Sequence, residues 1–515
     1  ISNIIFDRTS AGGTAMGASI GIVDYKVNNI AAVADNDSDG GVYVTDEQNN
    51  EKDTTRDEVK DLRKLVNDQL SAEEKAQLGT KAAVAGEASG KGKITANAVK
   101  VNAETSGTIT GVSVAGVTAG ASQPNNRGTG SGFKIPAQIA GAGSASVNEI
   151  SGNTAALLEG VEVTTAGTNR DVKVSASDDS MIGAYSGAAA LKKKGRQANS
   201  GGFSATLAGA VAYNEVKTGV TAQIKDASIE NAKTITNQAA REGAVVAAGL
   251  ALGVDTSGQG TGSATAINAG VSASINKIDN STHAVMNIVN TSTSGGDKTN
   301  IANIAQSKDV QVAGGITAQY AKGGGIGIGA AVSSLHAAND IQSRITNSDL
   351  NNVGTLKAYA QTDLVQVGTV LSAGVIQGQN GNGVQAAVAD NQLNNNVNVT
   401  IEGKAINADA IDAKAFDGEI TATTTYLKDL AADGFDVDGK DAMADVNAAK
   451  ADVSVDKDKL GAEKKDNDGQ EQGDDGRSVA AFEADDKKGN LIVSGAVSVI
   501  ANTSSQGKVA AGAAA

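Results

Sequence analysis

The segment AGAVAYNEVKTGVTAQIKDASI, which begins at Ala208, decides the fold because it combines strand-like alternation with copies elsewhere in the chain. In its second half, Val220, Ala222 and Ile224 alternate with polar residues. A period of two is typical of a β-strand that buries one face. The segment is therefore predicted to be a strand with these three side chains on one face.

This anchor block and a second block alternate along the sequence. Copies of the anchor block begin at Gly17, Gly141, Asn268, Gly327 and Gly383. Copies of the second block begin at Ile94, Asp171, Lys233, Asp309, Thr355 and Asn490. Self-similarity at a regular period is the signature of a repeat architecture, in which each repeat buries its apolar face against the next one.

The chain is therefore predicted to be all-β: a parallel β-helix (β-solenoid) built from repeats of about 55–65 residues, with small helical or loop insertions. If each coil uses about 20 residues, one repeat makes about three coils, and about 400 solenoid residues give a rod of roughly 90–100 Å. The alternative is a wide solenoid of long strands, with two strands per repeat. Alternation does not separate these two geometries.

Two segments break the repeat pattern and are predicted to be insertions. In residues 45–80, apolar residues recur at helical spacing between Val59 and Leu70, which predicts a helix. Residues 426–480 are rich in Ala and Asp, which predicts an acidic insertion. The predicted organisation is a solenoid repeat in 1–44, a helical insertion in 45–80, solenoid repeats in 81–425, an acidic insertion in 426–480 and a truncated repeat in 481–515.

Composition excludes several classes of protein. The chain has 515 residues, a net charge of −15, no Cys and no Trp. The acidic balance argues against nucleic acid as a partner, and the absence of Cys excludes disulfides. No apolar run reaches the length of about 18 residues that a membrane helix needs, so no transmembrane segment is predicted. Because the chain begins without Met and ends within a patterned run, we interpret it as a piece of a longer polypeptide.

One motif is typical of a calcium site. Asp35, Asp37 and Asp39 precede Gly40, and Asp46 follows, which matches D-x-D-x-D-G-x5-D. Carboxylates at alternating positions converge on a hard cation, and the glycine allows the sharp turn. The motif differs from an EF-hand in its last ligand and in the strand-like residues before it. Calcium is therefore the one cofactor that the sequence predicts; the alternative is an acidic turn.

None of the remaining motifs is predicted to be catalytic. The stretch Gly17–Gly21 fits G-x-S-x-G, but it lies inside a repeat strand and not at a strand-to-helix turn. The two histidines, His283 and His336, lie in comparable repeat blocks and are predicted to occupy a polar strand face. The basic run Lys192–Arg196 is predicted to be a solvated turn. The protein is accordingly predicted not to be an enzyme.

The repeat residues around Asn148, Asn214 and Asn276, with strands such as Asp171–Ser177, resemble a group of large repetitive bacterial surface adhesins. These are the leukotoxin-type and filamentous haemagglutinin-like proteins. The resemblance implies a secreted or surface-anchored β-solenoid at the bacterial cell surface, acting as an elongated stalk, an attachment surface or both. It implies a glycan or protein of a host or neighbouring cell as partner. It supplies no catalytic residues.

Two functions other than adhesion are also compatible with the sequence. One is a polysaccharide-degrading β-helix enzyme, although such sites usually carry aromatic platforms for sugars and this chain has no Trp and 7 Tyr. The other is a segment of a cytotoxin, which only the family resemblance suggests. Lateral or end-to-end self-association is also expected, because exposed strand edges pair readily with other chains.

Deleting Thr45–Thr80 is expected to leave the solenoid folded, because insertions within repeats project from one face of a solenoid. Circular dichroism and thermal unfolding of the shortened chain measure this. Global unfolding of the deletion variant would contradict the prediction that this segment is an insertion.

Overall fold

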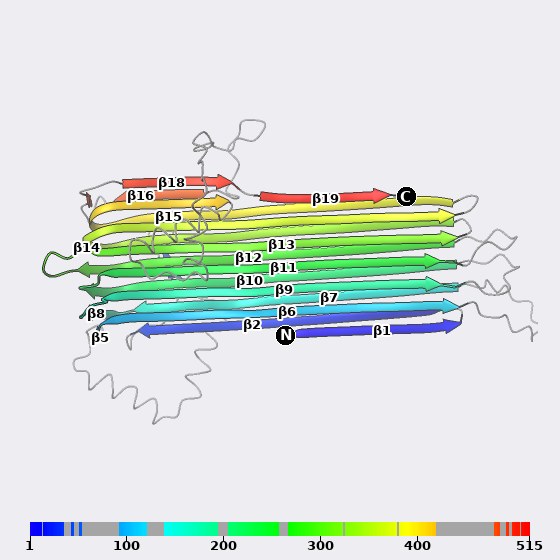
Figure 1. The fold of residues 1–515 in the computed structure, drawn as a ribbon, viewed down its shortest axis with the longest axis horizontal. Coiled ribbons are helices and arrows are strands. Elements are labelled where there is room, and N and C mark those ends of the chain that lie inside the picture. Colours follow the sequence, from blue (N-terminus) through cyan, green and yellow to red (C-terminus); the bar gives the residue numbers. More distant parts are fainter. Residues whose placement is uncertain are drawn as a thin grey trace, which may run out of the picture.

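The fold is a stack of long parallel strands, shown in the computed structural model in Figure 1. Every strand pairing in the described part of the chain is parallel, except in a hairpin of β3 (Tyr43–Thr45) and β4 (Glu51–Asp53). The structure describes residues 1–12, 14–34, 43–45, 51–53, 92–120, 138–193, 204–256, 266–322, 325–377, 381–418, 478–484, 491–493, 497–504 and 506–514.

The anchor block and the second block form two facing sheets. The first sheet contains β2 (Ala15–Ala34), β7 (Gln138–Glu159), β10 (Ser204–Glu230), β12 (Ala266–Ser292), the first parts of β14 (Gly325–Gln377) and β15 (Gly381–Gly418), and β16 (Ser478–Ala484). The second sheet contains β1 (Ser2–Gly12), β6 (Ala98–Gly120), β9 (Asp171–Lys192), β11 (Thr234–Asp255), β13 (Thr299–Lys322), the later parts of β14 and β15, β18 (Val497–Ser504) and β19 (Gln506–Ala514). Three short strands lie where the chain passes from the first sheet to the second, and they pair with the equivalent part of a neighbouring coil. They are β5 (Gly92–Ala96), β8 (Val161–Thr165) and β17 (Leu491–Val493).

The register shows that one repeat makes one wide coil. Ser204 of β10 pairs with Ala266 of β12, 62 residues further along. Thr234 of β11 pairs with Asn300 of β13, 66 residues further along. The predicted parallel β-solenoid is therefore confirmed, in its wide form with long strands.

The expectation of three narrow coils per repeat, and of a rod of 90–100 Å, is wrong. A whole repeat advances the stack by one strand spacing, which is about 4.8 Å. The long axis of the molecule instead follows the strands (Figure 1). Alternation along a strand is the same in both geometries, because it depends only on the pleat and not on where the chain turns.

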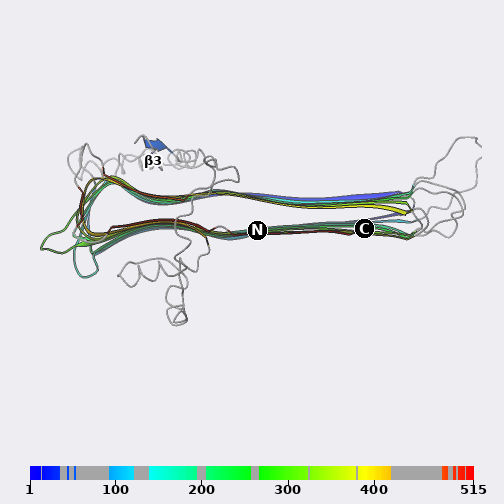
Figure 2. The ribbon, with the colours of Figure 1, turned by 90° about the horizontal axis from the view of Figure 1, so that it is seen from above.

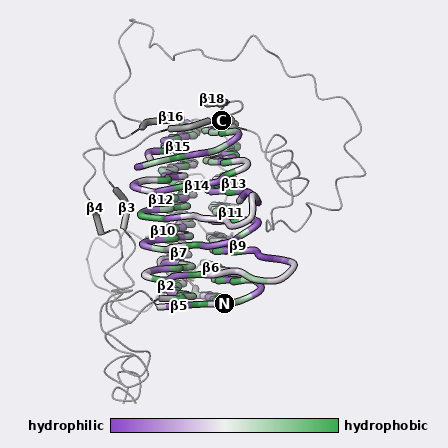
Figure 3. The backbone as a smooth tube through the Cα atoms, turned by 90° about the vertical axis from the view of Figure 1, so that its left-hand side faces the viewer, coloured by the Kyte–Doolittle hydropathy of each residue, from purple (hydrophilic) through white to green (hydrophobic). Residues whose placement is uncertain are grey.

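The two sheets lie close together over most of their length and separate into a wider lobe at one end, where the described strands bend from one sheet toward the other (Figure 2). Viewed from this lobe, the coils lie above one another as a stack (Figure 3). The fold is thus a flat slab, wide along the strands and short along the stacking direction.

Four successive coils turn at a corner where one residue adopts a left-handed backbone conformation. Successive coils place Gly160, Asp226, Ile288 and Asn347 at this corner, with φ values of 65°, 47°, 56° and 51°. Gly, Asp and Asn tolerate this region, whereas a β-branched residue rarely enters it. Ile288 adopts it because the register of its strand in the stack places it at the corner.

The core differs between the lobe and the part of the slab where the two sheets lie close together, which we call the narrow half. In the lobe, Val220, Ala222 and Ile224 are fully buried, as predicted from their alternation. In the narrow half the buried apolar side chains are mostly alanines, including Ala140 and Ala208. Small side chains let the two sheets approach closely, so the core composition follows the distance between the sheets.

The repeat pattern is interrupted between Ala34 and Gly92 and again between Gly418 and Ser478. The hairpin of β3 and β4 occupies the start of the first interruption, where a helical insertion was expected. The predicted helix around Val59–Leu70 lies outside the described residues. The predicted acidic insertion, 426–480, overlaps the first three residues of β16, and its remainder also lies outside the described residues.

Removing residues 204–265 is expected to leave a folded, shorter stack, because β12 would then pair with β7 in the register that β10 has now. Circular dichroism and small-angle scattering measure the strand content and the dimension along the stack. Removing 204–233 is the matched control: it deletes half a coil and joins two neighbouring strands of the same sheet, so this variant is expected to misfold. Equal behaviour of the two variants would contradict one coil per repeat.

Candidate binding surface and buried polar network

A ladder of asparagine side chains runs through the interior of the slab. Asn148, Asn214 and Asn276 are fully buried on successive strands of the first sheet. Asn148 donates to Asn214 at 3.1 Å, and Asn214 donates to Asn276 at 2.9 Å. Each also donates to a backbone carbonyl of the facing sheet, at 2.7–2.8 Å. The ladder therefore joins the coils along the stack and the two sheets across it.

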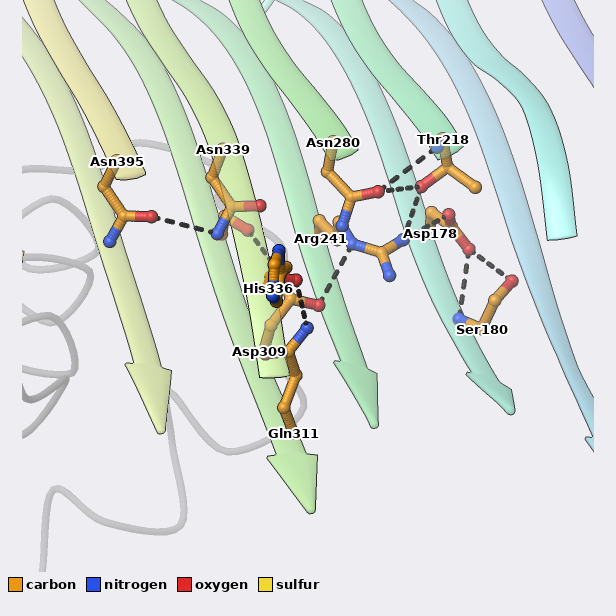
Figure 4. Close-up of polar contacts among 11 residues, drawn as sticks. Asp178, Ser180, Thr218, Arg241, Asn280, Asp309, Gln311, His336, Asn339 and Asn395 are labelled. Carbon is orange, nitrogen blue, oxygen red and sulfur yellow. Dashed lines mark hydrogen bonds and ion pairs between the residues drawn. The ribbon is translucent and has the colours of Figure 1, made fainter. Parts of the chain in front are cut away.

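The ladder changes sheet where the repeat loses its asparagine. Leu335 of β14 follows Asn276 in the register. On the facing sheet, Gln366 donates to Gln311 at 2.8 Å, and Gln311 donates to the backbone carbonyl of His336 at 3.0 Å (Figure 4). Amide side chains thus continue to bridge the two sheets where Leu335 takes the place of an asparagine.

Serine hydroxyls join the sheets in the narrow half. The Oγ atoms of Ser19 and Ser113 lie 2.6 Å apart across the interior, and those of Ser144 and Ser186 are also 2.6 Å apart. Such contacts require the backbones to be close, which only small side chains allow. These interior hydroxyls are buried and are unavailable to a ligand from solvent.

A cluster of paired charges is also buried inside the slab (Figure 4). Arg241 of β11 has a fully buried side chain between two carboxylates of neighbouring strands. Its Nη1 lies 2.7 Å from Asp178, and its Nε lies 3.1 Å from Asp309. Nη1 also donates to Thr218 of the facing sheet at 2.7 Å. One guanidinium therefore holds three coils and both sheets together.

This cluster has no room for a substrate. The nearby cavity, lined by Asp178, Ser180 and Thr218 among others, has a volume of about 10 Å³. That volume holds about one water molecule. The arrangement of one arginine between two carboxylates therefore serves the structure. Burying these charges unpaired would be costly, so their contacts determine how the coils align.

Sequence reasoning missed this cluster because its members come from three different repeats. One signal was available: Arg241 lies an even number of positions before Val245, which faces inward. Alternation alone therefore places a cation inside, where it needs partners. Which carboxylates supply them follows only from the register of β9, β11 and β13.

The outer surface of the first sheet carries a polar groove of about 180 Å³ where the slab widens. Asp340 lies in it, and its carboxylate accepts hydrogen bonds from His283 at 2.9 Å, from Gln342 and from Asn396 at 3.0 Å. Burial favours the neutral form of Asp340, but these hydrogen bonds favour the ionised form more and hold its pKa below the usual range. The other lining residues are Asp279, Asn280, Ala338, Asn339 and Asn394.

A second charged group lies beside the groove on the same face. Glu215 contacts Lys217 at 2.6 Å and Lys277 at 3.1 Å, and Tyr213 donates to it at 2.9 Å. Burial opposes ionisation of Glu215, but these hydrogen bonds outweigh it and lower its pKa to about 2. Burial and the neighbouring carboxylate raise the pKa of Tyr213 to about 12. At neutral pH this surface therefore presents fixed charges and amides.

The predicted calcium ligands Asp35, Asp37, Asp39 and Asp46 lie outside the described residues. Within the described residues, no group of three or more His, Asp or Glu side chains is placed to hold a metal ion. Both histidines lie beside carboxylates on the outward side of the first sheet: His283 contacts Asp340 and is only 6% exposed, and His336 lies 3.4 Å from Asp390.

The prediction of a solvated basic turn is wrong at its first residue. The side chain of Lys192 is 2% exposed and lies 3.5 Å from Asp255. Burial lowers the pKa of Lys192, although Asp255 opposes this effect. The register places Lys192 and Asp255 at paired positions of adjacent strands.

Comparisons with known proteins give no significant match: no family model, no curated protein and no solved structure is similar to this chain. Among the described residues, no helix has the length and apolarity to cross a membrane.

Replacing Arg241 with Ala is expected to lower the free energy of unfolding by about 3–5 kcal/mol, because two buried carboxylates lose their partner. Urea unfolding measures the change. Lys308→Ala is the control: this lysine on the neighbouring strand makes an exposed pair with Glu242 at 3.9 Å, and exposed pairs contribute about 0–1 kcal/mol. The triple variant R241M/D178N/D309N is expected to recover part of the loss. Equal effects at Arg241 and Lys308 would contradict a structural role for the cluster.

Proposed function

We propose that this chain is a segment of a secreted or surface-anchored bacterial filamentous adhesin, and that it acts as an attachment surface. The observation that carries the proposal is the wide coil. A repeat of 62 residues between Ser204 and Ala266 lengthens the stack by one strand, about 4.8 Å. A solenoid of this kind builds broad flat faces and is a poor spacer.

The position of the groove supports attachment through the first sheet. Asp279 of β12, Asp340 of β14 and Asn394 of β15 come from three successive strands and line the groove at the outer surface. Amide and carboxylate groups in fixed positions form hydrogen bonds with the hydroxyls of a glycan. Neighbouring side chains hold Asp340 ionised and orient its carboxylate. The partner that this chemistry fits is a cell-surface glycan.

The distribution of charge supports binding over turnover. Asp178 and Asp309, the two carboxylates that pair with Arg241, are buried inside the slab. The groove carboxylate Asp340 has its pKa lowered, whereas a general acid for glycoside cleavage needs a raised pKa. The geometry therefore favours an adhesive surface over a polysaccharide-degrading site.

The double variant Asp279→Ala/Asn394→Ala is expected to lower binding of the purified chain to its glycan by at least about tenfold, since it removes two groove contacts. The measurement is binding to an array of glycans and matrix proteins, followed by titration of the best ligand. An EDTA arm reports any contribution of calcium at Asp35–Asp46.

Asn382→Ala is the matched control, because Asn382 is an exposed residue on the same strand, β15, outside the groove. It is expected to bind as the parent chain does. Saturable binding that the double variant leaves unchanged would overturn the role of the groove, and no binding to any array component would overturn attachment by this segment.

A further inference from the structure

The outer face of the second sheet is apolar over the narrow half. In β11, Val245, Ala247 and Ala251 face the interior, and the alternate positions face solvent. Leu250 is on the outside and is 47% exposed. The strand therefore has apolar residues on both faces, with the larger side chains outside.

The register aligns these outward side chains into columns. Leu250 pairs with Ile316 of β13, which pairs with Leu371 of β14, and the latter two are each 45% exposed. In the next outward column, Leu252, which is 37% exposed, pairs with Ala318, and Ala318 pairs with Ala373. The face thus has a ridge of large side chains, and beside it the two alanines leave a shallow depression on β13 and β14.

Charged residues end this face abruptly. Outward positions from Met181 to Leu191 in β9, and their partners in β11, β13 and β14, include no Asp, Glu, Lys, Arg or His. At the lobe side the next outward positions of three adjacent strands are Glu242, Lys308 and Asp363. We define the apolar face as the outward positions between this charged column and Lys322.

The apolar face is large enough for a stable interface. The outward partners of this face in β6, from Thr108 to Thr118, are also uncharged. The five stacked strands β6, β9, β11, β13 and β14, with eleven residues per strand, therefore correspond to about 870 Å², from a spacing of about 4.8 Å and a rise of about 3.3 Å per residue. The largest apolar patch of a typical monomer is about 300–600 Å². A stable complex buries about 800 Å² on each partner.

We propose that the apolar face binds the same face of a second copy of this chain. A flat sheet is complementary in shape to another flat sheet, and two sheets pack face to face about 10 Å apart. A twofold axis places the Leu250–Ile316–Leu371 ridge of one copy over the depression at Ala318 and Ala373 of the other. The contact is isologous, so it closes as a dimer.

Lipid is a less suitable occupant of this face. The charged column at Glu242, Lys308 and Asp363 and the exposed Lys322 bound the face at both ends. Insertion would carry one of these charged ends through the hydrocarbon. It would also expose the backbone groups of the outermost strands to lipid, where they have no partners.

The experiment is sedimentation velocity of the whole chain over a concentration series. The parent chain is expected to dimerise. Ile316→Lys is expected to weaken dimerisation by at least about 30-fold, because it buries a charge at the centre of the interface. Circular dichroism of the variant should match that of the parent, since Ile316 faces solvent in the monomer.

Two controls separate the interface from general effects of charge. Gln306→Lys places the same charge outward on β13, beyond the apolar face. Val271→Lys places it on the outer face of the first sheet, at a residue that is 50% exposed. Both variants are expected to dimerise as the parent chain does.

Three results would overturn the proposal: a parent chain that stays monomeric, a dimer that Ile316→Lys leaves intact, or a dimer that only Val271→Lys dissociates. Flotation with neutral phosphatidylcholine vesicles tests the other occupant. Binding of monomer to vesicles that Ile316→Lys abolishes would assign the face to lipid and would also overturn the proposal.

Discussion

In-register stacking of one coil on the next is the constraint on which the rest of the structure depends. It brings equivalent residues of successive repeats into contact, so a side chain that bonds to its own kind is reinforced at each step. Asn148, Asn214 and Asn276 show this directly, because the first two amides each donate to the next and all three donate to the facing sheet. A shift by one residue would turn these amides outward and would expose the aliphatic side chains of the lobe.

The narrow half inverts the usual distribution of polar and apolar residues. The Oγ atoms of Ser19 and Ser113 lie 2.6 Å apart in the interior, whereas Ile20 and Ile22 face outward on the same strand as Ser19 and are 61% and 65% exposed. The close approach of the sheets explains the interior, since mostly small side chains such as Ala, Ser and Gly fit between them. The large side chains are thereby left on the outside, and the slab acquires apolar faces that its own chain does not cover in the described residues.

The wide coil also changes how function is built on this scaffold. A narrow solenoid gains length from each repeat, whereas this one gains area, and residues far apart in sequence meet on one face. The polar groove at Asp340 and the apolar face at Ile316 lie on opposite sheets and on different halves of the slab. Attachment and self-association can therefore use separate surfaces.

Alternation and repetition in the sequence determined the strands, the parallel stacking and the assignment of Val220, Ala222 and Ile224 to the core, because these depend on local pleat and on copies of one pattern. The coil width, the Arg241 cluster and the groove at Asp340 were decided by tertiary structure. Each depends on which strand neighbours which, and a period of two is identical for any register. In the narrow half, the alternation of Ser19 with Ile20 predicts a strand but does not tell which of the two side chains faces the interior. The short distance between the sheets decides this, because it admits the smaller side chain.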